Sequence, residues 1–184
     1  MTAKYNPPVL ARLITQLQHA YSGELAAAYA YRGHWRSVKD PGERERIRTI
    51  ENEEWHHREL VGAMLRDLGA APLPMREVRF LIIGRAIGAA CHVIGHFAAM
   101  YGAGRLERTN IVEYEDAADY AIACGREDLV DCLLTMAEVE WDHEQYFRSR
   151  VEGHPLLRIF RLWAPPPPRK AIRARLADVL AKSA

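Results

Sequence analysis

The chain has 184 residues, enough for one domain with a sizeable buried core. Apolar residues make up 49% of it and charged residues 27%, which excludes an intrinsically disordered protein. Its 25 basic and 24 acidic side chains nearly cancel, so the charge balance gives no sign of nucleic-acid binding.

The N-terminal third of the chain is predicted to form two helices. The first is expected from about Pro8 to Val38, because Asp40-Pro41-Gly42 then supplies the residues of a turn. The second is expected from about Glu43 to Leu68, because Gly69 follows it with two prolines beyond, the usual order at the end of a helix.

The third helical region, about Met75 to Cys124, is predicted to be long and broken. We expect the break at Gly102-Ala103-Gly104, with Thr109 or Asn110 capping the restarted helix. A fourth helix is expected from about Glu127 to Glu152. These elements predict an all-α fold, a ferritin-like antiparallel four-helix bundle.

Part of the third region is apolar enough to resemble a membrane span. Phe80 to Gly104 has the necessary length. Arg85, His92 and His96 interrupt it, however, and a charge near the bilayer centre is costly. We therefore expect a central helix buried on most sides, whose glycines allow close packing, with peripheral contact to a membrane in place of a span.

The tail after the fourth helix has its own composition. Pro165 to Pro168 predicts a rigid extended spacer, and Arg169 to Ala181 predicts an additional basic amphipathic helix. We therefore divide the chain into a bundle domain, 1–153, and a tail, 154–184. The tail helix is suited to an anionic membrane surface; packing across the bundle or a homodimer contact is the alternative.

The cysteines and the N-terminus indicate a cellular location. Cys91, Cys124 and Cys132 are odd in number and lie in apolar helical pattern, as reduced core thiols do. Residues 1–8 contain no apolar export segment and no cleavage signal. We expect a cytoplasmic protein, which includes peripheral attachment to the inner face of the membrane.

Two of the predicted helices carry the same Glu-x-x-His motif, Glu54 with His57 and Glu140 with His143. Residues three apart share one face of a helix, so the carboxylate and the imidazole can converge on one metal ion. Di-metal sites in helical bundles use this motif twice and add one Glu from each of the other two helices. A carboxylate-rich set with two imidazoles suits two iron ions, with manganese as the alternative.

Helical periodicity selects the other two ligands. Glu24 lies on the apolar stripe of the first helix. In the third helix Glu113 continues the series of Leu106 and Asn110; we select it and keep Glu115, on a neighbouring face, as the alternative. A carboxylate within an apolar seam requires compensation, which paired cations provide. The predicted metal ligands are Glu24, Glu54, His57, Glu113, Glu140 and His143.

Several neighbouring polar residues have simpler interpretations. Glu53 and His56 repeat the motif one residue out of phase, and we expect them on the wetter flank of the second helix. Glu51 and Glu144 are expected to be surface charges, or acceptors for a ligand histidine. Tyr120 is the candidate catalytic residue, able to hydrogen-bond an intermediate or pass an electron; core packing is the alternative.

These motifs resemble those of the demethoxyubiquinone hydroxylases, di-iron monooxygenases of ubiquinone biosynthesis in the ferritin-like superfamily. The run His19-Ala20-Tyr21-Ser22-Gly23-Glu24 is similar to that family's His-Ala-Gly-Glu segment. Val112-Glu113, with Tyr120 seven residues past the Glu, is similar to the family's Val-Glu-Glu run and its later Tyr. Tyr114 replaces the second Glu of that run, and Asp119 stands where a His commonly precedes the Tyr.

The resemblance implies a monooxygenase that activates O2 to hydroxylate a small apolar, quinone-like substrate. It also implies an external reductant, either a nicotinamide cofactor such as NADH or an electron-carrier protein. A ferritin-like or rubrerythrin-like iron protein, which oxidises iron or detoxifies peroxide, is the second hypothesis, although the chain has no Cys-x-x-Cys pair for a rubredoxin-type iron site. A metal-free helical interaction module is the third, and it leaves the carboxylates in the apolar seams unexplained.

Overall fold

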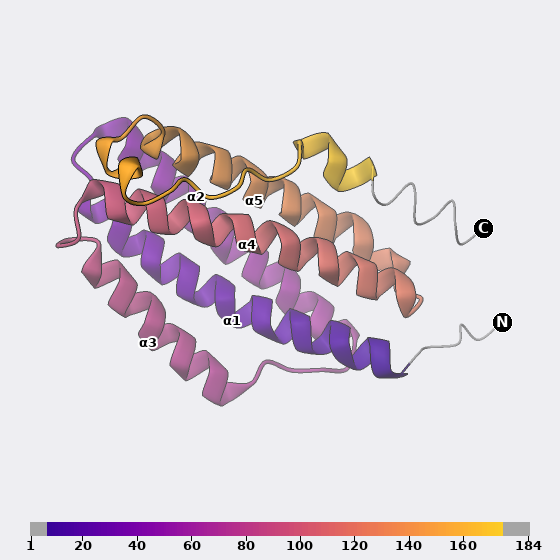
Figure 1. Cartoon of the computed structure of the whole chain (residues 1–184). Helices are drawn as coiled ribbons and strands as arrows, with labels where there is room; N and C mark the ends of the chain where they lie inside the picture. Colours follow the sequence, from indigo (N-terminus) through magenta and orange to yellow (C-terminus); the bar gives the residue numbers. More distant parts are fainter. Residues whose placement is uncertain (1–6, 175–184) are drawn as a thin grey trace. The chain divides into compact units, whose positions relative to one another are not determined.

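The computed structural model describes residues 7–174, and within that range every regular element is a helix (Figure 1). The predicted all-α class is confirmed. None of the helices in this range is both long and apolar enough to cross a bilayer. In chain order the elements are α1 (Pro7–Ser37), α2 (Pro41–Asp67), α3 (Pro74–Ala90), α4 (His96–Ala123), the 3-10 turn η1 (Glu127–Leu129), α5 (Val130–Val151) and the 3-10 turn η2 (Pro155–Arg158).

The chain divides into two compact units, and the division falls inside α4. Of the described residues, 7–99 belong to one unit and 100–174 to the other. The predicted separation of a bundle domain, 1–153, from a tail, 154–184, is a different division, and it stays a prediction.

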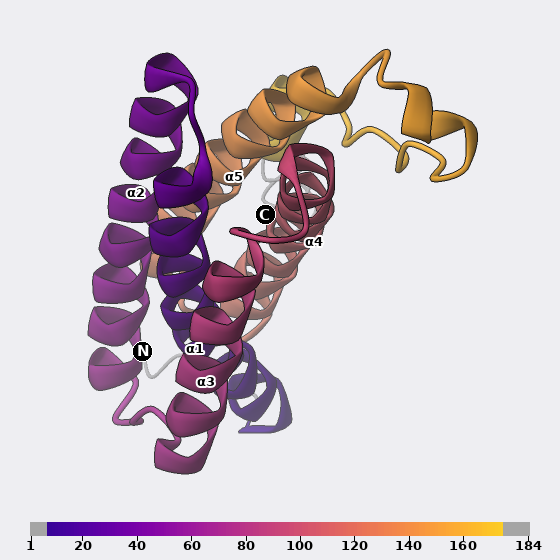
Figure 2. The same ribbon diagram turned by 90° about the vertical axis from the view of Figure 1, so that its left-hand side faces the viewer.

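The unit of residues 7–99 is built on α1, against which both α2 and α3 pack (Figure 2). Helix α2 begins two residues before the predicted Glu43: the Asp40 side chain accepts a hydrogen bond from the Glu43 amide at 2.8 Å, and Pro41 occupies the first turn. Gly69 follows the helix with a left-handed φ of 68°, which a residue with a Cβ atom rarely adopts.

Two glycines allow α3 to approach α1 closely. A Cβ atom at Gly84 would overlap the backbone of Ala26, and one at Gly88 would lie 2.7 Å from the Tyr29 carbonyl oxygen. Because the obstructing atoms are backbone atoms, neither helix can yield without moving as a whole. The close helix packing expected of these glycines is therefore present, and it holds α3 against α1.

The third helical region breaks earlier than predicted, at residues 91–95. Gly95 has a φ of 83° there, and α4 begins after it. The segment 102–104, where we expected the break, lies inside α4, and so do the expected caps Thr109 and Asn110. A glycine in a helix costs about 1 kcal/mol relative to alanine, an amount that tertiary packing readily overrides.

Helix α3 is also not the buried central helix that its apolar sequence predicts. Only Gly84 and Gly88 of this helix are buried. Val78, Ile82 and Ile87 are 54%, 63% and 46% exposed. The reason is that α3 contacts α1 through a narrow glycine face, which leaves its larger apolar side chains on the outside.

The unit of residues 100–174 contains most of α4, together with α5 and the tail. Gly125, with a φ of 76°, ends α4, and η1 leads into α5, so the fourth predicted helix is confirmed with a tighter first turn. Residues 169–174 are helical and form the start of the predicted tail helix. The rest of that prediction, through Ala181, lies outside the described residues.

The cysteines are free, as expected from the sequence. Cys91 and Cys124 are buried, whereas Cys132 is partly exposed. Burial raises the pKa of all three thiols above its usual range, and the charge of Asp131 raises that of Cys132 further. These side chains are therefore protonated thiols at neutral pH.

Candidate metal centre

Three buried ligand side chains meet on α1 and α2, and we refer to Glu24, Glu54 and His57 as the α1–α2 half-site. One ligand atom of each lies within 4.8 Å of the others. The Glu24 Oε1 atom is 3.9 Å from His57 Nδ1. No member is more than 4% exposed. The structure thus brings together the three ligands predicted from the first two helices.

Ordinary helical periodicity places these side chains. Glu54 and His57 are one turn apart on α2, in a seam that includes the fully buried Ile50. Glu24 lies two turns after the fully buried Leu17 on α1. Each carboxylate therefore interrupts an apolar seam at mid-helix, as the sequence predicts.

A second group lies on α4 and α5, and we refer to Glu107, Glu140 and His143 as the α4–α5 half-site. His143 Nδ1 lies 3.3 Å from Glu140 Oε2 and 4.0 Å from Glu107 Oε1. One ligand atom of each lies within 4.8 Å of the others, and all three side chains are fully buried. Glu140 and His143 are the second predicted motif, whereas Glu107 was not predicted.

The structure does not bring Glu113 into the α4–α5 half-site. Six residues separate Glu107 from Glu113, which corresponds to a rotation of about 240° around the helix axis, so the two side chains point in different directions. Glu113 and the alternative Glu115 are both only partly buried. We therefore propose Glu107 in place of Glu113 as the α4 ligand.

One sequence signal was available for Glu107. Tyr114 follows it by seven residues, the same offset that relates Glu113 to Tyr120. In the structure Tyr114 is 2% exposed, whereas Leu106, with which we began the predicted seam, is 43% exposed. The predicted seam on α4 was thus one residue out of phase with the buried one.

Tyr120, the predicted catalytic residue, is distant from this half-site along the helix. It comes thirteen residues after Glu107, a rise of about 20 Å along the axis of α4. Its side chain is partly buried. A catalytic role for Tyr120 stays a prediction.

Glu51 is buried and is not the surface charge that we expected. It is 5% exposed and lies one turn before Glu54 on α2. Its carboxylate accepts hydrogen bonds from Arg32 Nε at 2.7 Å, Trp35 Nε1 at 2.7 Å and Trp55 Nε1 at 3.3 Å. Two of these donors come from α1, so Glu51 ties α1 to α2 beside the ligands.

Glu144, also expected at the surface, is fully buried on α5 directly after His143. Its Oε1 atom accepts hydrogen bonds from Arg148 Nε at 2.9 Å and Trp163 Nε1 at 2.6 Å. Helical periodicity could not reveal this burial, because Trp163 belongs to the tail.

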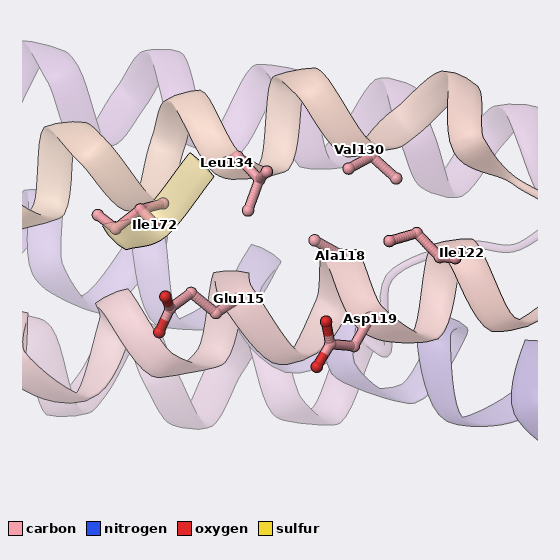
Figure 3. A pocket seen from close by; sticks show the side chains of 7 residues that line it. All are labelled: Glu115, Ala118, Asp119, Ile122, Val130, Leu134 and Ile172. Atoms are coloured by element: carbon pink, nitrogen blue, oxygen red, sulfur yellow. The ribbon is translucent and has the colours of Figure 1, made fainter. Parts of the chain in front are cut away.

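Glu115 lines a separate small pocket in the unit of residues 100–174 (Figure 3). Glu115 and Asp119 are one turn apart on α4 and are the acidic members of its lining; the other described lining residues are apolar. The alternative ligand Glu115 thus lies beside a pocket that contributes two carboxylates and no imidazole. The lining residues are Glu115, Ala118, Asp119, Ile122, Val130, Leu134 and Ile172.

His34 on α1 is buried and neutral. Burial lowers its pKa from 6.5 to about 4, and the charge of His96 acts in the same direction. Its ring stacks on that of Tyr31, with 6.4 Å between the ring centroids. His34 is therefore a neutral core histidine at neutral pH. It does not belong to a Glu-x-x-His motif in the sequence.

The donor set of each half-site fits an iron or manganese ion. Two carboxylates and one imidazole provide oxygen and nitrogen donors without a thiolate, whereas structural zinc favours more sulfur or nitrogen. Neighbouring buried carboxylates lose hydration and repel one another, so a cation stabilises them. Each half-site contains one Glu-x-x-His motif and one further Glu, and two such sets make up the ligands of a bundle di-iron centre.

The sequence model of one protein family, described as ubiquinone biosynthesis protein COQ7, matches residues 11–146. This range covers most of the chain and includes all six residues of the two half-sites. No curated protein and no solved structure matches the chain significantly. The match ends within α5, so the tail lies beyond it.

Proposed function

Because the chain belongs to the family of the ubiquinone biosynthesis protein COQ7, we propose that it hydroxylates a demethoxyubiquinone-like ring at two iron ions held by its half-sites. This family is a ferritin-like di-iron family that hydroxylates demethoxyubiquinone with O2. The observation that carries the assignment to this chain is that each unit buries two carboxylates and one imidazole within 4.8 Å of one another.

In this proposal each half-site supplies three ligands. Glu24, Glu54 and His57 come from α1 and α2; Glu107, Glu140 and His143 come from α4 and α5. Iron is the metal we expect, with manganese as the alternative. When bound, the metal ions supply the reduction of O2 and the transfer of an oxygen atom to the ring.

The residues of the chain contribute position and exclusion of water. The six side chains are almost completely buried, so the site is dry and the ligand charges are poorly screened. Glu51 and Glu144, each held by arginine and tryptophan donors, fix the helices that carry the ligands. Preorganised ligands of this kind need little rearrangement when metal binds.

The reaction requires an electron donor from outside the chain. One atom of O2 enters the ring as a hydroxyl group and the other leaves as water, which consumes two electrons and two protons in addition to O2. A nicotinamide cofactor such as NADH, or an electron-carrier protein, supplies the two electrons. Small apolar quinone and O2 are thus the substrates in this proposal.

We further propose that α3 contacts the membrane in which a long-chain quinone resides. Its exposed apolar residues Val78, Ile82 and Ile87 are accompanied by the exposed Arg79 and Arg85. This combination is suited to a monotopic contact with an anionic bilayer. The contact would be peripheral and would place the protein on the inner face of the membrane.

The tail is less suited to the membrane than its sequence suggested. The Arg173 guanidinium lies 2.9 Å from Glu138 Oε1 and 2.7 Å from Asp131 Oδ1, and Arg169 Nε lies 3.2 Å from Asp142 Oδ1. Both arginines therefore pair with acids on α5. These ion pairs favour our alternative, that the tail packs on the protein's own helices; the homodimer contact stays a prediction.

Iron analysis and oxygen uptake test the proposed function together. After anaerobic loading, the protein should retain close to two irons per chain and couple NADH oxidation, through an added reductase, to hydroxylation of a short-chain demethoxyquinone. Glu54→Gln should lose metal and product together, because Glu54 belongs to the α1–α2 half-site. Less than half an iron per chain in the unaltered protein would refute the proposal. No observation favours iron storage, peroxide detoxification or a metal-free module.

A further inference from the structure

The described tail runs back along α5 from Trp163 to Arg173. Trp163 donates to Glu144, Trp141 donates from Nε1 to the Pro167 carbonyl at 2.9 Å, and Arg173 donates to Glu138. The contacts move steadily toward the start of α5 as the tail proceeds. Ile172 is 2% exposed, so the tail also packs against the unit near its last described residues. We refer to residues 161–174 as the strap.

Trp163 is the residue of the strap that contacts the buried carboxylate of Glu144. Its indole N–H and the Arg148 guanidinium both donate to Glu144 Oε1, and the guanidinium lies 4.9 Å from the centre of the Trp163 ring. Removing a donor from a fully buried carboxylate leaves that charge less well stabilised. The position of Glu144, and of the α5 turn that carries it, therefore depends on Trp163.

The Trp163 ring also rests on α4. A Cβ atom at Gly104 would overlap the ring, so glycine is required for this contact. Tyr101, one turn earlier, packs edge-on against the ring at 5.3 Å and donates its hydroxyl to the Arg161 carbonyl at 2.7 Å. One indole thus contacts both ligand-bearing helices of the unit of residues 100–174.

These contacts lie one turn from the ligands on both helices. Gly104 is three residues before Glu107, and Glu144 is four residues after Glu140. The distance between Glu107 and His143 depends on the separation of α4 and α5 at the turns that carry these two residues. We infer that Trp163 is a positioning residue, which sets the spacing of Glu107 from Glu140 and His143 for metal binding. The inference rests on the proposed function, because it concerns the same α4–α5 half-site.

Three substitutions separate this role from general packing. Trp163→Phe keeps an aromatic ring beside Gly104 but loses the N–H donor to Glu144. Gly104→Ala keeps the donor but displaces the ring. Ile159→Ala, on a side chain 74% exposed four residues before Trp163, is the matched control. Each variant is first compared with the unaltered protein by thermal unfolding without metal, to establish that it folds.

Anaerobic titration with Co²⁺ then measures affinity, stoichiometry and the visible absorption of the bound ion, which reports coordination geometry. We expect two Co²⁺ per chain in the unaltered protein and in Ile159→Ala. Trp163→Phe and Gly104→Ala should weaken Co²⁺ binding by about tenfold or more and alter the absorption band. The combined loss in Gly104→Ala with Trp163→Ala should be smaller than the sum of the two single losses, since both substitutions disturb the contact between the ring and α4.

The outcomes distinguish the two proposals. Failure of the unaltered protein to bind Co²⁺ or iron would refute the proposed function itself. Two bound ions in the unaltered protein, with unchanged affinity and absorption in folded Trp163→Phe and Gly104→Ala, would overturn the role of Trp163 and leave the proposed function standing.

Discussion

Glu107 Oε1 and His143 Nδ1 lie 4.0 Å apart in the fully buried space between α4 and α5. Sequence periodicity pointed to Glu113 on α4, so these two glutamates provide a direct comparison. Glu107→Gln should lose at least one of the two metal ions, whereas Glu113→Gln should retain both, because only Glu107 lies with Glu140 and His143. Metal content after anaerobic iron loading measures the difference. Equal metal loss in both variants would contradict the assignment of Glu107.

Acid should destabilise the protein through His34. Its pKa is about 4 in the folded protein and 6.5 in its ordinary state, so between these values the unfolded chain binds the proton more readily. The contribution of neutral His34 to stability is complete above pH 6.5 and is lost as the pH falls toward 4, by about 3 kcal/mol in total. His34→Gln should remove this part of the pH dependence in urea unfolding of the metal-free protein. An unchanged slope would show that other groups cause the acid lability.

The crossing of α1 and α3 should be sensitive to a single methyl group. Gly84→Ala places a Cβ atom against the backbone of Ala26, and we expect it to lower the free energy of unfolding by about 1–3 kcal/mol. Gly102→Ala is the control: no atom lies within 4 Å of its added Cβ, and replacing a helical glycine there should raise stability by about 0.5–1 kcal/mol. Urea unfolding measures both. Stabilisation by both substitutions would contradict the close approach of α3.

The proposed membrane face of α3 can be tested with vesicles. Ile82→Ser combined with Ile87→Ser removes two exposed apolar side chains, each contributing about 1.5–3 kcal/mol when fully buried. Sedimentation with vesicles containing anionic lipid should therefore show binding weakened by about tenfold or more. Ile159→Ser is the control, because Ile159 is 74% exposed and lies outside α3. Retained vesicle binding in the α3 variant would exclude α3 as the contact, and metal content should be unchanged in either case.

The helices themselves were predictable from local chemistry. Asp40 and Pro41 start α2 and Gly69 ends it, and each acts within one turn of its own position. Glu54 with His57 was predictable for the same reason, since one helical turn brings both side chains to one face. Local signals of this kind do not depend on how distant parts of the chain pack.

The errors arose where the partner is remote in sequence. From local sequence alone Glu144 resembles a surface charge, because its donor Trp163 lies in the tail. Glu51 resembles one for the same reason, because its donors Arg32 and Trp35 lie on α1. The phase of α4 was misjudged because Leu106 is as apolar as a core residue although it is exposed. Hydropathy indicates which side chains favour burial, but only the packed helices decide which of them are buried.

The burial of the thiols has a consequence for a protein that handles oxygen. Thiolate, not thiol, reacts readily with peroxide, and burial raises the pKa of Cys91 and Cys124 so that little thiolate exists at neutral pH. Sulfenic acid formation at these side chains is therefore slow. Reactive oxygen that escapes during turnover would therefore react only slowly with these two thiols, although they belong to a protein that handles O2.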